Sequence, residues 1–315
     1  MDDADTSGPE TADRTTRRAV LRRGGALAVG TVAATGSVAL AGCAGRETGG
    51  SGAGDDGSDD PPLIAHRGFA AEHPENTVAA IEAATAVVDR IELDVRRCGT
   101  GELVVFHDAT LGRVTDATGR VDRTSADRLA ELSVEGSGEP VPTLAEALDA
   151  VPADAWVLLD LKRRGIAADA LAVAADRDHG LAVTADDPAV IEAVRAADPA
   201  VETVYGVRES VPARLLRPLI PAGSDGAGLP EWAYPPQDVR AMVETAAGLD
   251  CAAVSPRYEL CLRTDLVARA RAAGLRVLPW TIGSVREYDA VAAAGADAVV
   301  SDVSHARSGG SADRE

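Results

Sequence analysis

The stretch Pro62-Leu63-Ile64-Ala65-His66-Arg67-Gly68 decides how the rest of this sequence is interpreted. A short apolar run between a proline and a glycine is typical of a buried strand rather than a helix. The run ends in a histidine, which can move protons near neutral pH, and an arginine, which can grip an oxyanion through two parallel hydrogen bonds. Gly68 allows a sharp turn or a close approach to a ligand. The stretch therefore predicts a core strand that carries chemistry at its C-terminal end.

The next strand-like run, residues 90–95, carries two acids. Strand alternation places Glu92 and Asp94 on one face and the apolar residues on the other. Two carboxylates side by side repel each other unless a cation lies between them. A solvated strand face is the ordinary alternative, but the neighbouring runs look buried, so we favour a metal site.

A second histidine follows the apolar run of residues 103–106. Only residues 96–102 separate this run from the acidic strand, which is too short for a helical crossover. A hairpin around Gly99-Thr100-Gly101 is the expected link. It would bring His107 and Asp108 alongside Glu92.

The strand predicted over residues 156–162 carries Asp160 and Lys162 on one face. Lys162 is the single lysine among 31 basic residues. Two arginines follow it directly, and arginine supplies every other basic side chain, so a lysine is not needed here for surface charge alone. We therefore expect a specific role for this ammonium.

Strand and helix signals alternate over the rest of the chain. Further strands are expected near residues 181–184, 202–206, 252–255, 275–280 and 296–301, with helices near 78–88, 142–148, 166–175, 189–197, 238–247, 264–273 and 285–294. Residues 212–236 are expected to form a long loop, and residues 109–141 a small insertion with a short helix at 126–132. Eight barrel strands plus one hairpin arm account for the pattern, so the sequence predicts an α/β fold, a TIM (β/α)8 barrel with a small insertion after the third strand.

The composition restricts the possible functions. Hydrophobic residues make up 46% of the 315 residues and aromatic residues 3%, which predicts a large, aliphatic core. The formal net charge is −19. Such a surface repels nucleic acid and anionic membranes, so no nucleic-acid partner is expected. An acidic surface with almost no lysine resembles proteins of high-salt organisms.

The first sixty residues are predicted to direct the protein out of the cytoplasm. Arg17 and Arg18 form a twin-arginine pattern, and a weakly apolar run ends in Leu40-Ala41-Gly42-Cys43. Residues 1–43 therefore resemble a twin-arginine signal with a lipoprotein box, in which Cys43 is lipidated. An uncleaved transmembrane anchor is the alternative, but the run is rich in Gly, Ala, Thr and Ser. We expect an exported lipoprotein on the outer face of the cell membrane.

The segments that flank the predicted barrel are polar. Residues 44–61 are expected to form a flexible acidic Gly/Ser tether and residues 305–315 a disordered tail.

An exported protein permits disulfides, and Cys251 and Cys261 could pair; Cys98 is more simply a small buried side chain. The sequence leaves the oligomeric state open.

Several motifs occur in a fixed order and together resemble one family. They are His66-Arg67-Gly68, His73-Pro74-Glu75-Asn76-Thr77, Glu92-Leu93-Asp94-Val95, His107-Asp108 with Leu111, Pro142-Thr143-Leu144, Leu159-Asp160-Leu161-Lys162, Trp280-Thr281 and Gly295-Ala296-Asp297. The ordered set resembles the glycerophosphodiester phosphodiesterases, which are TIM-barrel enzymes. The resemblance places such a domain at residues 62–304.

The resemblance implies a role for each matching residue. His66 and His107 correspond to the acid–base histidines and Arg67 and Lys162 to the phosphate-binding cations. Glu92, Asp94 and Asp160 correspond to ligands of one divalent cation, Ca²⁺ or Mg²⁺, although the family has a glutamate at the position of Asp160.

Two further residues are assigned supporting roles. Glu75 is expected to hold His66 or to touch the metal. Trp280 is expected to form an apolar wall for the substrate or to fill the barrel.

The implied activity is metal-dependent hydrolysis of a small-molecule glycerophosphodiester to an alcohol and glycerol phosphate. One alternative is a related barrel phosphodiesterase that acts on intact phospholipid. The other is a lipid-anchored protein that binds phosphate esters without turnover. Simple phosphate capture needs cations and amides rather than two titrating imidazoles, so the paired histidines favour an enzyme.

Overall fold

The computed structural model describes residues 60–207 and 238–307. The predicted signal with Cys43, the tether up to residue 59, the long loop at 212–236 and the tail from residue 308 lie outside these residues. In the described part of the chain, no helix is both long enough and apolar enough to cross a membrane.

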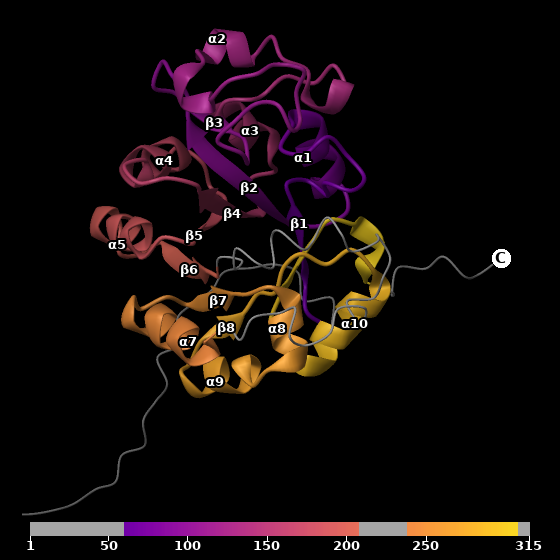
Figure 1. The fold of residues 1–315 in the computed structure, drawn as a ribbon, viewed down its shortest axis with the longest axis vertical. Coiled ribbons are helices and arrows are strands. Elements are labelled where there is room, and N and C mark those ends of the chain that lie inside the picture. The colour runs from indigo at the N-terminus through magenta and orange to yellow at the C-terminus, as the bar shows by residue number, and fades with distance from the viewer. Residues whose placement is uncertain (1–59, 208–237, 308–315) are drawn as a thin grey trace, which may run out of the picture. The chain divides into compact units, whose positions relative to one another are not determined.

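A single curled sheet forms the centre of the fold (Figure 1). Its strands are β1 (Leu63–His66), β2 (Arg90–Arg97), β3 (Leu103–Val105), β4 (Trp156–Leu161), β5 (Gly180–Ala185), β6 (Glu202–Gly206), β7 (Ala253–Ser255), β8 (Arg276–Val277) and β9 (Val299–Ser301). Eight of them run parallel in the order β8-β7-β6-β5-β4-β2-β1-β9, and β3 pairs antiparallel with β2. The prediction of eight barrel strands plus one hairpin arm is confirmed.

Backbone hydrogen bonds close this sheet into a barrel. Just beyond β8, Ile282 donates to the Val300 carbonyl at 3.0 Å and accepts from the Asp302 amide at 2.9 Å. The two ends of the strand order therefore meet. A closed ring leaves no unpaired parallel edge.

Side-chain alternation divides the strands between two layers. Every second residue points into the barrel, where small and medium aliphatic side chains from successive strands pack together: Ile64, Leu158, Ala182, Val204, Ala253, Leu278, Ala298 and Val300. The intervening residues, such as Ile91, Leu93 and Leu159, pack outward with helix side chains. Glu92, Asp94 and Asp160 alternate with these outward-packed residues, so polar groups lie above the apolar filling at the C-terminal end of the barrel.

Helices cover the outside of the sheet (Figure 1). They are α1 (Val78–Thr85), α2 (Ala126–Leu129), α3 (Leu144–Ala150), α4 (Ala167–Ala174), α5 (Pro188–Ala197), α7 (Val239–Gly248), α8 (Tyr258–Arg263), α9 (Leu266–Ala272) and α10 (Val285–Ala294), with 3₁₀ turns η1 (Val121–Arg123), η2 (Val134–Gly136) and η5 (Ser304–Ala306). Thr77 caps α1, and Thr143 with Glu146 forms a capping box at the start of α3. Each such cap contributes about 1 kcal/mol.

The segment between β3 and α3 builds a small core of its own. It contains η1, α2 and η2, and its apolar residues pack in a cluster separate from the barrel: Cys98, Val104, Phe106, Leu111, Val114, Val121, Leu129, Leu132, Val134 and Val141. Val104 and Phe106 come from β3 and the residue after it. The hairpin arm is therefore the base on which this segment folds.

The structure departs from the sequence predictions in several details. The six-residue helix α8 was not predicted, because fewer than two turns leave little periodicity to detect. Residues 305 and 306, assigned to the tail, belong to η5. Cys251 and Cys261 are both free and buried, so the possible disulfide is not formed.

Candidate active site

Three carboxylates meet where β2 and β4 run side by side. The strand register pairs Asp94 with Asp160 and places Glu92 two residues earlier on the same face. One oxygen from each acid lies within 4.8 Å of the others. Asp94 is fully buried, Glu92 nearly so and Asp160 partly so.

The chemistry of this cluster fits a hard divalent cation. All three donors are carboxylate oxygens, the ligands that Ca²⁺ and Mg²⁺ take. Burial, together with the neighbouring Asp94, raises the pKa of Glu92 well above its ordinary value. A cation among the three oxygens would oppose this rise by favouring the ionised carboxylate. Glu92, Asp94 and Asp160 are the residues that would hold the ion.

Two basic side chains already touch these acids. The Lys162 ammonium lies 2.7 Å from Asp94 Oδ1 and forms an ion pair with Asp160. Arg67 Nε lies 3.0 Å from Asp94 Oδ2, and its backbone N–H donates to Glu92 Oε2 at 3.1 Å. Although burial opposes ionisation, Lys162 and Arg67 hold the pKa of Asp94 well below its usual range. Both predicted phosphate-binding cations therefore lie at the acidic cluster.

His66 stands at the end of β1 with its ring held by a carboxylate. Its Nδ1 lies 2.6 Å from Asp302 Oδ1, and its Nε2 is 3.9 Å from Glu92 Oε2. A carboxylate on Nδ1 fixes the ring orientation and leaves Nε2 toward the acids. Burial, and then Arg67, lower the pKa of His66.

His107 follows β3 and shows the same local arrangement. Its Nδ1 lies 2.8 Å from Asp108 Oδ1, and its carbonyl accepts a hydrogen bond from Arg96 Nε at 2.7 Å. Arg113 in turn holds Asp108. Phe106, the residue before His107, donates its backbone N–H to the Asp94 carbonyl at 2.9 Å, so His107 lies next to the acidic strand. The hairpin prediction is confirmed, because β2 and β3 bring His107 back to the acidic strand.

Glu75 does not have the role that the sequence suggested. Asp302, not Glu75, holds His66, and Glu75 is absent from the acidic cluster. The buried Glu75 carboxylate instead accepts from Arg67 at 3.2 Å and from Arg113 at 2.6 and 2.8 Å. It is a support for two arginines, Arg67 directly after β1 and Arg113 in the insertion.

Three supporting residues escaped sequence reasoning: Asp302, Asn76 and Arg113. Asn76 adopts a left-handed backbone (φ 60°) and donates from Nδ2 to Asp94 Oδ2 at 2.8 Å. Asp302 directly follows β9, so its position at the C-terminal end of a barrel strand was an available signal. Arg113 lies inside the insertion, and nothing in its sequence surroundings marks it.

Trp280 lies at the mouth of the barrel. It packs, partly buried, on the interior aliphatic cluster, and its Nε1 donates to the Ser255 carbonyl at 2.9 Å. The guanidinium of Arg257 lies 5.2 Å from its ring centre. The contacts are those expected of a residue that fills the barrel, and they leave part of the ring exposed.

A closed (β/α)8 barrel with histidines, basic residues and a carboxylate cluster at the C-terminal ends of its strands is the architecture of a TIM-barrel enzyme. Residues 66–306 match the model of the glycerophosphoryl diester phosphodiesterase family. The chain belongs to this family.

Individual relatives agree with this assignment. A phosphodiesterase from Oleispira antarctica, solved with its product sn-glycerol-3-phosphate, is 26% identical with a TM-score of 0.60 over 77% of this chain and 93% of that one. A glycerophosphodiester phosphodiesterase from Caldanaerobacter subterraneus is 38% identical over 28% of this chain. An uncharacterized protein from Mycobacterium tuberculosis is 36% identical over 34% of it. These two alignments each span 40% of the relative's own length.

Proposed function

We propose that this protein hydrolyses glycerophosphodiesters to an alcohol and glycerol phosphate, with His66 and His107 as its acid–base pair. One observation carries the proposal. Each histidine has its Nδ1 on a carboxylate, His66 Nε2 lies 3.9 Å from Glu92 Oε2, and His107 follows Phe106, whose N–H donates to the Asp94 carbonyl. The product bound to the Oleispira antarctica relative supports the same class of product here.

Charge neutralisation is the first task of such a site. A phosphodiester resists attack because its anionic oxygens repel nucleophiles and its leaving alkoxide is strongly basic. Arg67 and Lys162 are positioned to donate hydrogen bonds to phosphate oxygens from beside Asp94. A Ca²⁺ or Mg²⁺ ion bound by Glu92, Asp94 and Asp160 would add Lewis-acid stabilisation of the phosphate oxygens.

Proton transfer is the second task. One histidine takes a proton from the attacking hydroxyl through Nε2, and the other gives a proton to the leaving oxygen. Asp302 and Asp108 hold the two rings at Nδ1 and so leave both Nε2 atoms for this exchange. The nucleophile is water, or the glycerol 2-hydroxyl followed by water that opens the resulting cyclic phosphate, and every one of these attacks needs the same pair of groups.

A direct assay tests the proposal. Purified protein is incubated with glycerophosphocholine, and glycerol phosphate release is measured with added Ca²⁺ or Mg²⁺ and with a chelator, at low and high salt. We expect release that depends on the divalent cation. Turnover that is indifferent to chelation would contradict the metal assignment, and no turnover of any glycerophosphodiester would contradict the activity.

The described surface supports a water-soluble diester rather than an intact phospholipid. Val87 and Leu262 are the large hydrophobic side chains exposed on the described residues, and neither belongs to the site. Entry into a lipid layer needs a contiguous apolar patch. A liposome assay with intact phosphatidylglycerol, run beside glycerophosphoglycerol, distinguishes the two substrates.

We also propose that the protein is exported and held to the membrane through lipid on Cys43. The support is the twin-arginine pattern followed by Leu40-Ala41-Gly42-Cys43. Cys43→Ser is expected to release the protein from the membrane fraction without changing the turnover of the purified domain. Equal membrane retention of wild type and variant would indicate an uncleaved helix instead.

A further inference from the structure

A pocket of about 290 Å³ adjoins the proposed site on the side of Lys162. Its walls come from the end of β2, the residues after β4 and the insertion around η1: Arg96, Arg97, Ala109, Arg120, Val121, Asp122, Lys162 and Arg163. Five of these eight residues are cationic and one is acidic. In a chain with a formal net charge of −19, a pocket lined mainly by positive side chains is unexpected.

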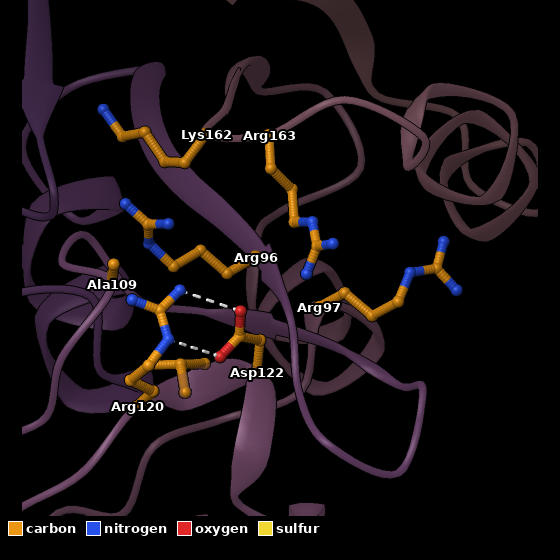
Figure 2. A pocket seen from close by; sticks show the side chains of 8 residues that line it. Arg96, Arg97, Ala109, Arg120, Asp122, Lys162 and Arg163 are labelled. Carbon is orange, nitrogen blue, oxygen red and sulfur yellow. Dashed lines mark hydrogen bonds and ion pairs between the residues drawn. The ribbon is translucent and has the colours of Figure 1, made fainter.

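Three of the five cations are already matched by acids. Arg97 pairs with Asp169, Arg120 pairs with Asp122 at 2.8 Å, and Lys162 contacts Asp94 and Asp160. Figure 2 shows that Arg120 and Asp122 face each other across the lower part of the pocket.

Arg96 and Arg163 provide the excess charge. Within the described residues, Arg163 makes no hydrogen bond or ion pair, and the bond that Arg96 makes runs from Nε to the His107 carbonyl. Figure 2 shows Arg96 extended between Lys162 and the Arg120–Asp122 pair, with Arg163 reaching down beside it. The Arg96 guanidinium points toward Ala109, and that of Arg163 lies near the start of the Arg96 side chain, so each offers a separate fork to a phosphate or carboxylate in the pocket.

The position of the pocket identifies which part of a substrate could enter it. Lys162 belongs both to the pocket wall and to the acidic cluster, so an occupant lies next to the reacting phosphate. The glycerol of a glycerophosphodiester is an uncharged polyol. An anionic group in the pocket must therefore belong to the alcohol on the other side of the phosphate.

We propose that this arginine-lined pocket is the subsite for the substrate's alcohol, and that the preferred glycerophosphodiesters carry a further anionic group, such as a phosphate monoester, on that alcohol. The inference rests on the proposed function and narrows its substrate class. At 290 Å³ the pocket has room for a small charged head group rather than a long chain.

A matched pair of substrates tests this inference. Glycerophosphoinositol and glycerophosphoinositol 4-phosphate differ by one phosphate, so the ratio of their kcat/KM values isolates its contribution. The wild-type protein is expected to prefer the phosphorylated substrate by about tenfold at low salt, because charge-assisted hydrogen bonds are the strong ones. The preference should shrink as salt is added. Equal kcat/KM values at low salt would overturn the inference.

Two adjacent arginines provide the variant and its control. Arg163→Gln should reduce the preference several-fold through KM rather than kcat, since the head group does not react. Arg163→Lys should retain part of it. Arg164→Gln removes the same charge one residue later, from an exposed side chain paired with Asp187 outside the pocket, and should leave the ratio unchanged. Equal ratios in Arg163→Gln and Arg164→Gln would remove Arg163 from the subsite.

A binding measurement separates failure of this inference from failure of the proposed function. Calorimetric titration with inositol 4-phosphate, the alcohol that the phosphorylated substrate would release, needs no turnover. Weaker binding by Arg163→Gln than by Arg164→Gln supports the pocket even if hydrolysis is absent. Equal binding by the two variants overturns the pocket even if glycerophosphoinositol is hydrolysed.

Discussion

The two histidines of the site are held in opposite ways. His66 stands on β1, is 12% exposed and is held by Asp302, which lies 236 residues later in the chain. His107 lies beyond the hairpin arm, is 33% exposed and is held by Asp108, the next residue. Closure of the barrel positions the first, and the insertion positions the second, because Arg113 holds Asp108 from within the insertion.

Because of this difference, the part of the site that contains His66 and the part that contains His107 depend on different regions of the fold for their stability. Asp302 directly follows β9, and the pairing of β9 with β1 keeps it beside His66. His107 depends on a separate small core whose local opening need not unfold the barrel. The insertion can therefore loosen one catalytic half while the other stays in place.

The largest effect is expected when either imidazole is removed. His66→Ala and His107→Ala should each lower kcat by about a hundredfold or more if both are the positioned proton-transfer groups of the proposed function. Similar losses of kcat at the two positions would show that the two histidines differ in how they are held in place but not in their part in the reaction. Thermal melting checks that each variant is folded. Normal turnover in either variant would remove that histidine from the pair.

The next effect concerns Lys162 and Asp160 on the barrel side. Lys162→Arg should lower kcat/KM by about tenfold or more, since a planar guanidinium does not fit where a compact ammonium does. Asp160→Asn should weaken metal binding, and added Ca²⁺ or Mg²⁺ should partly restore its rate.

A metal titration of both variants measures these effects. A purely structural ion pair between the two residues predicts near-normal activity for Lys162→Arg and an unchanged metal requirement for Asp160→Asn. Lys162 contacts both Asp94 and Asp160, so the contact agrees with either role and the titration decides.

A smaller effect is expected from the carboxylates that hold the rings. Asp302→Asn should lower kcat by about tenfold, as for a partner that orients a functional histidine. Asp108→Asn should cost only about threefold, because pairs near solvent contribute little. The nitrogen chemical shifts of each imidazole report its tautomer. A His66 tautomer and kcat unchanged by Asp302→Asn would refute the positioning role.

The smallest effect on turnover is expected from Arg113. Arg113→Gln should reduce activity by no more than about twofold and speed hydrogen exchange in residues 109–141, while the barrel strands keep their protection. Arg128→Gln is the matched control, because this exposed arginine of the insertion pairs with Glu131 and touches neither Glu75 nor Asp108. Faster exchange throughout the barrel strands would show that the two regions are not separable.

Sequence patterns located those groups whose positions depend on short-range geometry. Strand alternation placed Glu92 with Asp94 on one face, and the shortness of the hairpin link placed His107; the family resemblance added Asp160, which the strand register pairs with Asp94. The closed barrel follows from the order of strand and helix signals.

Contacts between distant segments could not be predicted in the same way. The partner of His66 depends on where β9 closes against β1, and the pairing of Arg113 with Glu75 depends on how the insertion folds back. Loop conformation decides both, and no local periodicity encodes it. For the same reason Glu75, which lies close to His66 in sequence, was assigned the wrong partner.

The alternating charges from His107 to Asp160 have a consequence for how this family can vary. Asp108, Arg113, Glu75, Arg67, Asp94, Lys162 and Asp160 form an unbroken series in which each charge faces an opposite one. Replacing one member leaves a neighbouring charge without its opposite partner. Substitutions that relatives tolerate should therefore occur at two paired positions together. The insertion is then no interchangeable module. An insertion transplanted from a relative must bring its own counterpart of Arg113, or Glu75 is left buried with half its support.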